Sequence, residues 1–187
     1  MPHSSTIVLS ALTIATLVAV ATPAHAQTQE TVAVGGSNVV VLKPAGAPRA
    51  SVILMPGGNG IMISRPGGSI GTLRGNQLVR TRESYRARGL AVMVTDAGTD
   101  LSAAVNYMAQ IKRPVTVIAT SRGTQRAARG IAAGARPDAL VLTSGFLAPE
   151  SGAGITVMSV LGSPAALPPT LVIHHRKDGC KFTNPAG

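Results

Sequence analysis

The segment VTVIATSRGTQ (115–125) leads from a short apolar run directly into Ser-Arg-Gly. A sharp turn from a strand into a helix strains the serine backbone, lifts the hydroxyl clear of the sheet and sets it at a helix N-terminus. Ser121 has this position in a G-x-S-x-G-like pattern, with Ala119 in place of the first glycine and Gly123 as the second. The pattern favours Ser121 as a nucleophile. The alternative is that Ser121 only caps the following helix.

A second group of small residues, PGGNG (56–60), follows an earlier apolar run. Such a loop can turn backbone N–H groups inward, and the N–H of Arg122 lies beside the serine. Together the N–H groups of Gly58, Asn59 and Arg122 would form an oxyanion hole. Two alternatives stay open: ordinary turn chemistry and a phosphate-binding loop. Against the phosphate loop, position 63 is Ile rather than the third glycine of G-x-G-x-x-G, and there is no Walker lysine.

These residues need a scaffold, and apolar runs bounded by Gly, Pro and Asp predict it. Strands are expected at 38–42, 51–55, 90–95, 115–119, 139–143 and 171–175, and helices at 73–88, 101–111 (with Asp100 as N-cap) and 124–133, with a short apolar piece at 155–161. Continuous apolar strands alternating with helices are typical of a mostly parallel sheet with helices on both faces. Ligands bind at the carboxyl ends of such strands.

Three segments together resemble the α/β-hydrolase superfamily, most closely its secreted bacterial esterase-like members. VILMPGGNG is similar to its third strand and oxyanion loop, VIATSRGT to its fifth strand and nucleophile elbow, and PTLVIHHRKDGC to its seventh strand and acid loop. The resemblance implies the α/β-hydrolase fold over nearly all of 27–187. It also implies a Ser–acid–His triad in that chain order. The expected activity is hydrolysis of a small-molecule carboxylic ester through an acyl-enzyme, with no metal and no cofactor.

The resemblance makes Asp178 the triad acid, although Asp-Gly is also a strong turn signal. Asp96 ends a strand at the same edge and is a weaker candidate, because a turn or cap residue is the more usual role there. His174 and His175 precede the acid, whereas the family's base follows it. Both are therefore weak candidates for the base. A non-catalytic exported binding protein that keeps the fold but lacks the base is the alternative to an esterase.

Three features predict that this chain is truncated at its C-terminus and lacks the last strand and helix of the fold. No covering helix follows the last expected strand, so an apolar face of the sheet would be bare. Cys180 is the only cysteine of a chain expected to reach an oxidising compartment. No histidine follows Asp178. A natural short form is the alternative.

The N-terminus and the charge bear on location and partners. Residues 1–26 have a short apolar run and end in Ala-His-Ala, which predicts a cleaved signal peptide, a secreted or periplasmic protein and no stable membrane anchor afterwards. The net charge is +10, but the basic residues are dispersed and aromatic residues are scarce, so nucleic-acid binding is not expected. Arg122, Arg126 and Arg129 share one helical face, which is typical of a solvated surface.

Overall fold

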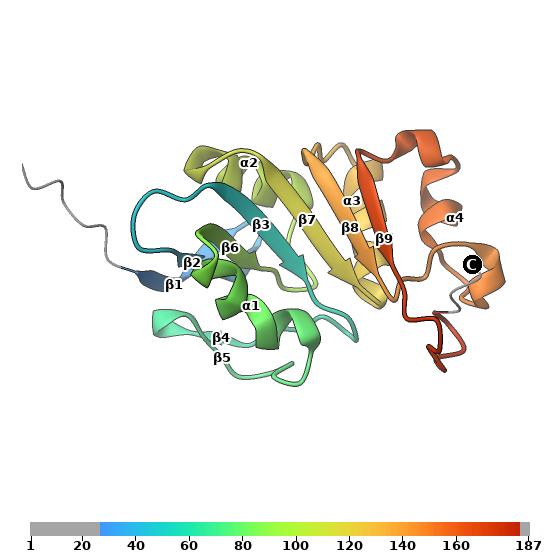
Figure 1. The fold of residues 1–187 in the computed structure, drawn as a ribbon, viewed down its shortest axis with the longest axis horizontal. Coiled ribbons are helices and arrows are strands. Elements are labelled where there is room, and N and C mark those ends of the chain that lie inside the picture. The colour runs from blue at the N-terminus through green and yellow to red at the C-terminus, as the bar shows by residue number, and fades with distance from the viewer. Residues whose placement is uncertain (1–26, 184–187) are drawn as a thin grey trace, which may run out of the picture.

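A computed structural model describes residues 27–183, whose centre is a seven-stranded sheet (Figure 1). In sheet order the strands are β1 (Thr28–Val34), β2 (Ser37–Lys43), β6 (Leu90–Val94), β3 (Ala50–Met55), β7 (Val115–Thr120), β8 (Ala139–Thr143) and β9 (Thr170–Ile173). The pairings from β6 through β9 are parallel, and the pairings β1–β2 and β2–β6 are antiparallel. The predicted mostly parallel sheet is confirmed.

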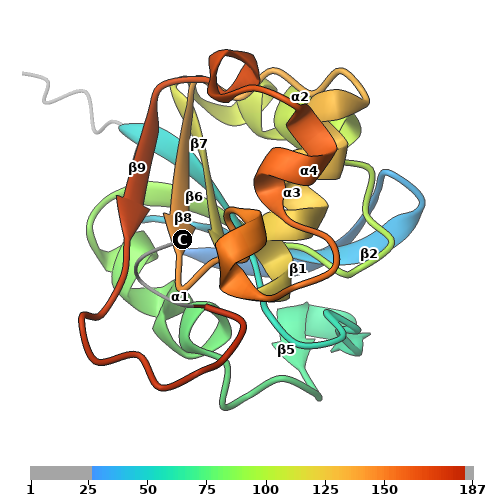
Figure 2. The ribbon, with the colours of Figure 1, turned by 90° about the vertical axis from the view of Figure 1, so that its right-hand side faces the viewer.

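Helices cover both faces, as predicted. They are α1 (Gln77–Ala87), α2 (Leu101–Ile111), α3 (Arg122–Ala132) and the short α4 (Val157–Leu161). Figures 1 and 2 show α1 on one face of the sheet and α2 and α3 on the other, with α4 packed outside α3. Each face therefore has its own core. One core joins the sheet to α2, α3 and α4, and the other joins it to α1.

Capping side chains decide where two of the helices begin. Asp100 accepts a hydrogen bond from the backbone N–H of Ala103 (2.7 Å), which confirms the predicted cap and bounds of α2. The predicted start of α1 at residue 73 was wrong. Asn76 accepts from the N–H of Leu78 (3.0 Å) and starts the helix at Gln77, while Leu73 has a positive φ of 54°.

Two further bounds differ: α3 begins at Arg122 rather than at residue 124, and β9 ends at Ile173 rather than at residue 175. The remaining differences are elements that were not predicted. β1 was not predicted, because its sequence TQETVAV has only a weak apolar alternation, and it pairs along the whole of β2. The glycine-rich segment after β3 holds a small hairpin of β4 (Ser64–Arg65) and β5 (Ser69–Ile70) around the 3-10 turn Pro66–Gly68. Two further 3-10 turns, Pro149–Ser151 and Pro164–Ala166, flank α4.

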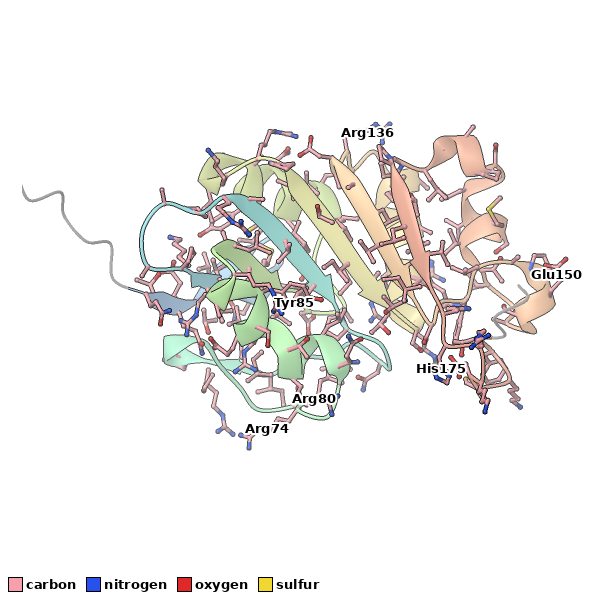
Figure 3. All side chains as sticks on the ribbon, viewed as in Figure 1. Arg74, Arg80, Tyr85, Arg136, Glu150 and His175 are labelled. Atoms are coloured by element: carbon pink, nitrogen blue, oxygen red, sulfur yellow. The ribbon has the colours of Figure 1, made fainter. Side chains whose placement is uncertain are left out.

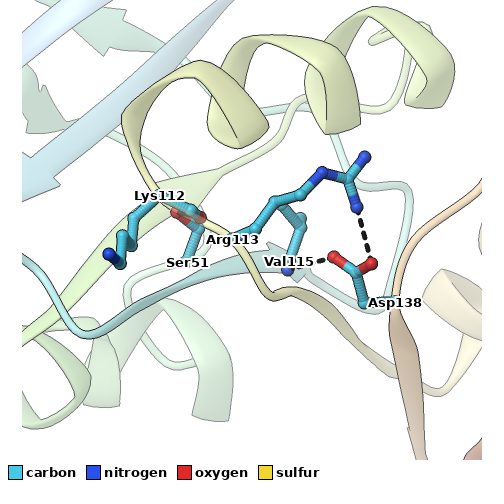
Figure 4. A network of polar contacts seen from close by, with 5 residues as sticks. All are labelled: Ser51, Lys112, Arg113, Val115 and Asp138. Atoms are coloured by element: carbon cyan, nitrogen blue, oxygen red, sulfur yellow. Dashed lines mark hydrogen bonds and ion pairs between the residues drawn. The ribbon is translucent and has the colours of Figure 1, made fainter.

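Polar contacts hold the start of β7, at the opposite end from the Ser121 turn (Figure 4). The carboxylate of Asp138 accepts from the N–H of Val115 (2.7 Å) and pairs with Nη1 of Arg113 (2.5 Å). The buried hydroxyl of Ser51 donates to the carbonyl of Lys112 (2.6 Å) at the end of α2. These contacts fix the connection from α2 into β7 and hence the register of the strand that carries Ser121.

The sheet is unevenly covered at β9. Leu171, Val172 and Ile173 are 56%, 50% and 49% exposed. A hollow of about 450 Å³ lies on the α1 side, between α1 and the faces of β7, β8 and β9. The bare apolar face expected there is present in the described structure.

The predicted signal peptide (1–26) lies outside the described residues. No helix within 27–183 is long and apolar enough to cross a membrane.

Candidate active site

Ser121 lies in the sharp turn between β7 and α3. Its backbone has φ 52° and ψ −127°, a conformation that costs a non-glycine residue free energy. The carbonyl of Ser121 accepts from both the N–H (2.9 Å) and the Oγ1 (2.7 Å) of Thr124, so the backbone begins the helix. The hydroxyl of Ser121 makes no capping hydrogen bond to α3, whose first turn lies wholly within the described residues. The side-chain capping role is therefore not what the structure shows.

Two glycines allow this turn to approach the end of β3. A Cβ on Gly123 would overlap the carbonyl oxygen of Met55 and lie 2.9 Å from that of Pro56. A Cβ on Gly57 would lie 3.0 Å from the Cβ of Ser121. Gly123 belongs to the predicted turn pattern, whereas the need for glycine at position 57 was not predicted. As a result the serine turn and the loop after β3 lie in direct contact.

The loop 56–60 is held from two sides. The Arg126 guanidinium donates to the carbonyls of Pro56 and, at 3.4 Å, of Gly58. The side chain of Asn59 accepts from the N–H of Ile61 (3.1 Å), so it folds back on its own loop. The N–H of Arg122 belongs to the first turn of α3, where N–H groups have no intrahelical acceptor. Gly58, Asn59 and Arg122 line one cavity, so the structure brings the three predicted oxyanion residues together.

Asp96, the weaker acid candidate, supports the neighbouring loops. One of its carboxylate oxygens accepts from the N–H of Met62 (2.7 Å) and the other from the N–H of Gly98 (3.0 Å). Burial lowers the pKa of Arg126, and the negative charge of Asp96 offsets part of that lowering. These contacts give Asp96 the turn role that the sequence favoured.

The arginines of α3 are not all a solvated face. Arg122 and Arg129 are exposed, but Arg126 is partly buried against the loop 56–60. Burial lowers the pKa of Arg126, the nearby Asp96 raises it, and the charges of Arg122 and Arg129 lower it further. The helical spacing of the three arginines was visible in the sequence. The loop 56–60, which covers Arg126, lies 66 or more residues away, so the sequence did not indicate this contact.

Asp178 follows β9, at the same edge of the sheet as Ser121. Its carboxylate accepts from the N–H of Cys180 (3.0 Å) and the hydroxyl of Thr183 (2.9 Å). These two hydrogen bonds are the main cause of its lowered pKa, to which the Ser144 hydroxyl and, when its ring is protonated, the nearby His174 also contribute. Asp178 is thus a turn residue whose carboxylate also lies near an imidazole.

The two histidines have different surroundings. Nε2 of His174 accepts from the N–H of Gly145 (2.7 Å), so the neutral ring carries its proton on Nδ1. That Nδ1 is buried and has no partner among the described residues. His175 lies just beyond the end of β9 (Figure 3) and lines the hollow on the α1 side. No hydrogen bond joins either ring to Ser121 within 27–183.

Backbone contacts align the three strand ends. The N–H of Ser121 donates to the carbonyl of Thr143 (3.1 Å), and the N–H of Ser144 donates to the carbonyl of Ile173 (3.1 Å). The serine turn, the end of β8 and the loop that carries His174 and Asp178 therefore lie in a row along one edge. This is the edge at which parallel sheets bind ligands.

A cavity of about 590 Å³ opens beside the serine turn. One wall is basic, because three arginines of α3 line it. Another is apolar and includes Phe146, Ile155 and Phe182. The two phenylalanines are the only ones in the chain, and their ring centroids are 5.9 Å apart. They lie 36 residues apart in sequence, so sequence reasoning missed this wall.

Comparison with known proteins shows which solved structures the chain is similar to. No protein-family model matches the sequence, and a search of curated proteins gives no match. Among solved structures, the chain is similar to a carboxylesterase of Lactobacillus plantarum WCFS1, with a TM-score of 0.58, 11% identity and coverage of 86% of this chain and 75% of that one.

Two further structures are similar. A lipase/esterase of Lactobacillus plantarum has a TM-score of 0.51 at 11% identity, over 86% of this chain and 83% of its own. An esterase/lipase of an uncultured bacterium has a TM-score of 0.51 at 16% identity, over 78% of this chain and 64% of its own. The mixed sheet, its strand order and these similarities show that the chain has the α/β-hydrolase fold.

Proposed function

We propose that this protein is a serine hydrolase that cleaves small-molecule carboxylic esters through an acyl-enzyme. The observation that carries the proposal is the turn at Ser121. It has a strained backbone, a hydroxyl that is not used as a helix cap and a position between β7 and the N-terminus of α3. Proteins keep such strain where surrounding structure enforces it, and it is concentrated at active sites. The esterases and lipases of similar fold support the same chemistry.

In the proposed reaction the Oγ of Ser121 attacks the ester carbonyl while its proton passes to a base. The N–H of Arg122 and those of the Gly58–Asn59 loop donate to the oxyanion of the tetrahedral intermediate. Collapse breaks the bond to the alcohol oxygen, which takes the proton from the base, and leaves an acyl-serine. Water then attacks the acyl group by the same route and releases the acid.

Among the described residues, His174 is a better candidate for the base than His175. Its free Nδ1 proton and its proximity to Asp178 fit an imidazole oriented by a carboxylate. Its Nε2 would have to leave the N–H of Gly145 to take the serine proton.

A second candidate function is a non-catalytic binding protein with this fold. It is favoured by one observation: within residues 27–183 no imidazole is hydrogen-bonded to Ser121. In that case the cavity beside the serine turn would bind a ligand without acylation.

Labelling with a fluorophosphonate probe tests these proposals, because phosphonylation needs an activated serine. We expect the unmodified protein to be labelled and Ser121→Ala not to be labelled, with a free energy of unfolding within about 1 kcal/mol of the original because no side-chain cap is lost. Loss of labelling in His174→Gln but not in His175→Gln would identify the base. An unlabelled but folded unmodified protein would instead support the binding protein.

We also propose that the protein is secreted or periplasmic, on the strength of the Ala24-His25-Ala26 cleavage pattern. Exported material should begin at Gln27 by N-terminal mass analysis. Exported material that retains Met1 would contradict this proposal.

A further inference from the structure

Three arginines of α3 form one wall of the cavity beside the candidate oxyanion hole. Arg122, Arg126 and Arg129 are spaced by four and three residues, which places them on one side of the helix. They line the same cavity as Gly58 and Asn59. The basic wall therefore begins at the serine turn and runs along α3 for seven residues, or about 10 Å.

No ion pair offsets the positive charge of this wall within the described chain. None of the three guanidiniums has a carboxylate within 4.0 Å among residues 27–183. The carboxylate of Asp96 acts on Arg126 through its charge but forms no ion pair with it, and it accepts hydrogen bonds from two backbone N–H groups. Glu150 (Figure 3) precedes the cavity-lining segment 153–155 and is exposed, and it forms no ion pair with any of the three arginines.

The three arginines differ in what their side chains do. Arg126 donates to two carbonyls of the loop after β3, so it has a structural task. For Arg122 and Arg129 the part of the chain described here provides no hydrogen-bond acceptor. Like charges at this spacing repel one another, and the lowered pKa of Arg126 has a contribution from both neighbours. An anion bound between Arg122 and Arg129 would reduce the repulsion between the guanidinium groups and accept hydrogen bonds from their free N–H groups.

The opposite wall offers a place for a hydrocarbon chain. Phe146, Ile155 and Phe182 line the cavity, and Ile155 and Phe182 are 43% and 37% exposed. Apolar atoms laid on these side chains would remove apolar surface from water. A ligand with a hydrocarbon chain and an anionic end matches both walls.

We propose that the cavity selects esters that carry a carboxylate, separated from the scissile carbonyl by a short hydrocarbon chain. Arg129, with Arg122, binds the carboxylate, and the Phe146–Phe182 wall holds the chain. The proposal rests on the proposed function, since it names the substrate class of the same site.

Matched ester pairs test it. The para-nitrophenyl monoester of glutaric acid and the para-nitrophenyl ester of valeric acid have acyl chains of the same length, and only the first ends in a carboxylate. We expect kcat/KM to favour the glutarate ester by tenfold or more, since a charge-assisted hydrogen bond contributes about tenfold to a hundredfold. Arg129→Gln should lower kcat/KM for the glutarate ester about tenfold more than for the valerate ester, and so remove that preference. Arg129→Lys should keep part of it, because the charge remains.

Arg80→Gln is the matched control. It also removes one positive charge, but Arg80 is an exposed residue of α1 on another part of the molecule (Figure 3). It should leave both rates unchanged. If Arg80→Gln reduced the preference for the glutarate ester as much as Arg129→Gln, the net charge would be acting at long range, and the proposal would be overturned. A second pair, the butyrate esters of para-hydroxybenzoate and para-hydroxybenzamide, carries the carboxylate or its neutral analogue on the alcohol side. These two esters should react alike, and a preference for the carboxylate here that equals the preference for glutarate would overturn the acyl-side assignment.

A binding measurement separates failure of this inference from failure of the proposed function. Calorimetric titration with glutarate should show binding to the unmodified protein that weakens about tenfold in Arg129→Gln. Glutarate binding without hydrolysis of any ester would support the anion site and contradict the proposed hydrolase function. Equal hydrolysis of both esters without glutarate binding would retain the hydrolase and reject the anion site.

Discussion

At the scale of single residues, the conformation of Ser121 is imposed by its neighbours. Its N–H is bound to β8, its carbonyl is bound by Thr124, and its Cβ faces the Cα of Gly57. An L-residue with φ 52° has its Cβ close to the backbone carbonyl, whereas glycine does not have this cost. The surrounding contacts therefore impose a backbone conformation that serine would not adopt by itself.

The first prediction is that Ser121→Gly stabilises the protein while Ser121→Ala does not. Glycine relieves the positive-φ strain, which costs about 1–3 kcal/mol, but loses about 0.5–1 kcal/mol to the greater freedom of the unfolded chain. The expected net gain over Ser121→Ala is about 1 kcal/mol in the free energy of unfolding, measured by urea denaturation. Equal stability of the two variants would show that the turn is not strained.

The residues of the turn could be predicted because their signals are local. Gly123 lies two positions after Ser121, and the contact that requires it follows from the strand–turn–helix geometry. Gly57, Arg126 and Phe146 contribute through contacts with residues far away in the sequence. No short pattern marks such partners, so the basic and apolar walls of the cavity needed the structure.

At the scale of secondary structure, β7 is fixed at both ends. Its first residue, Val115, donates to Asp138, and its last residue leads into the Ser121 turn. The Asp138 carboxylate also pairs with Arg113, which is 54% exposed. The two contacts of the carboxylate should contribute differently to the free energy of unfolding. An unpaired buried N–H costs about 1–3 kcal/mol, and an exposed ion pair contributes about 0–1 kcal/mol.

We therefore predict that Asp138→Ala lowers the free energy of unfolding by about 2 kcal/mol and Arg113→Ala by less than about 1 kcal/mol. The reason is that Asp138→Ala leaves the N–H of fully buried Val115 without its partner, whereas Arg113→Ala retains that hydrogen bond. Thermal and urea unfolding of both variants measure the difference. If the two substitutions cost the same, the ion pair and not the backbone contact stabilises the start of β7.

The bounds of buried strands could be predicted from the sequence more accurately than those of partly exposed elements. The buried strands β3, β6, β7 and β8 are continuous apolar runs, and their predicted bounds agree with the structure to within a residue. β1 is half polar and gains its place by pairing with β2, so it had no comparable signal. The start of α1 was placed too early because Gly75 and Asn76, which disfavour a helix interior, were included in the helix, whereas Asn76 is its N-cap.

At the scale of the whole molecule, the sheet combines a well-covered and a poorly covered half. β3 and β6 have helices on both faces, whereas the α1 side of β8 and β9 borders an open hollow. Three successive apolar residues on β9 are about half exposed, and β9 has only one hydrogen-bonded neighbour among the described strands. An apolar edge strand of this kind is a site for pairing with other chains.

The last prediction is that Leu171→Lys reduces self-association of this chain. A lysine on an edge strand opposes pairing with another copy, because it places a charge where apolar contact would form. Ile61→Lys is the control: Ile61 is 55% exposed and Leu171 is 56% exposed, and each change adds one positive charge, but Ile61 lies in the loop after β3. Light scattering coupled to size exclusion, over a range of concentrations, should show a larger monomer fraction for Leu171→Lys alone. An equal gain in Ile61→Lys would attribute self-association to net charge and not to β9, since the two variants differ only in where the charge is placed.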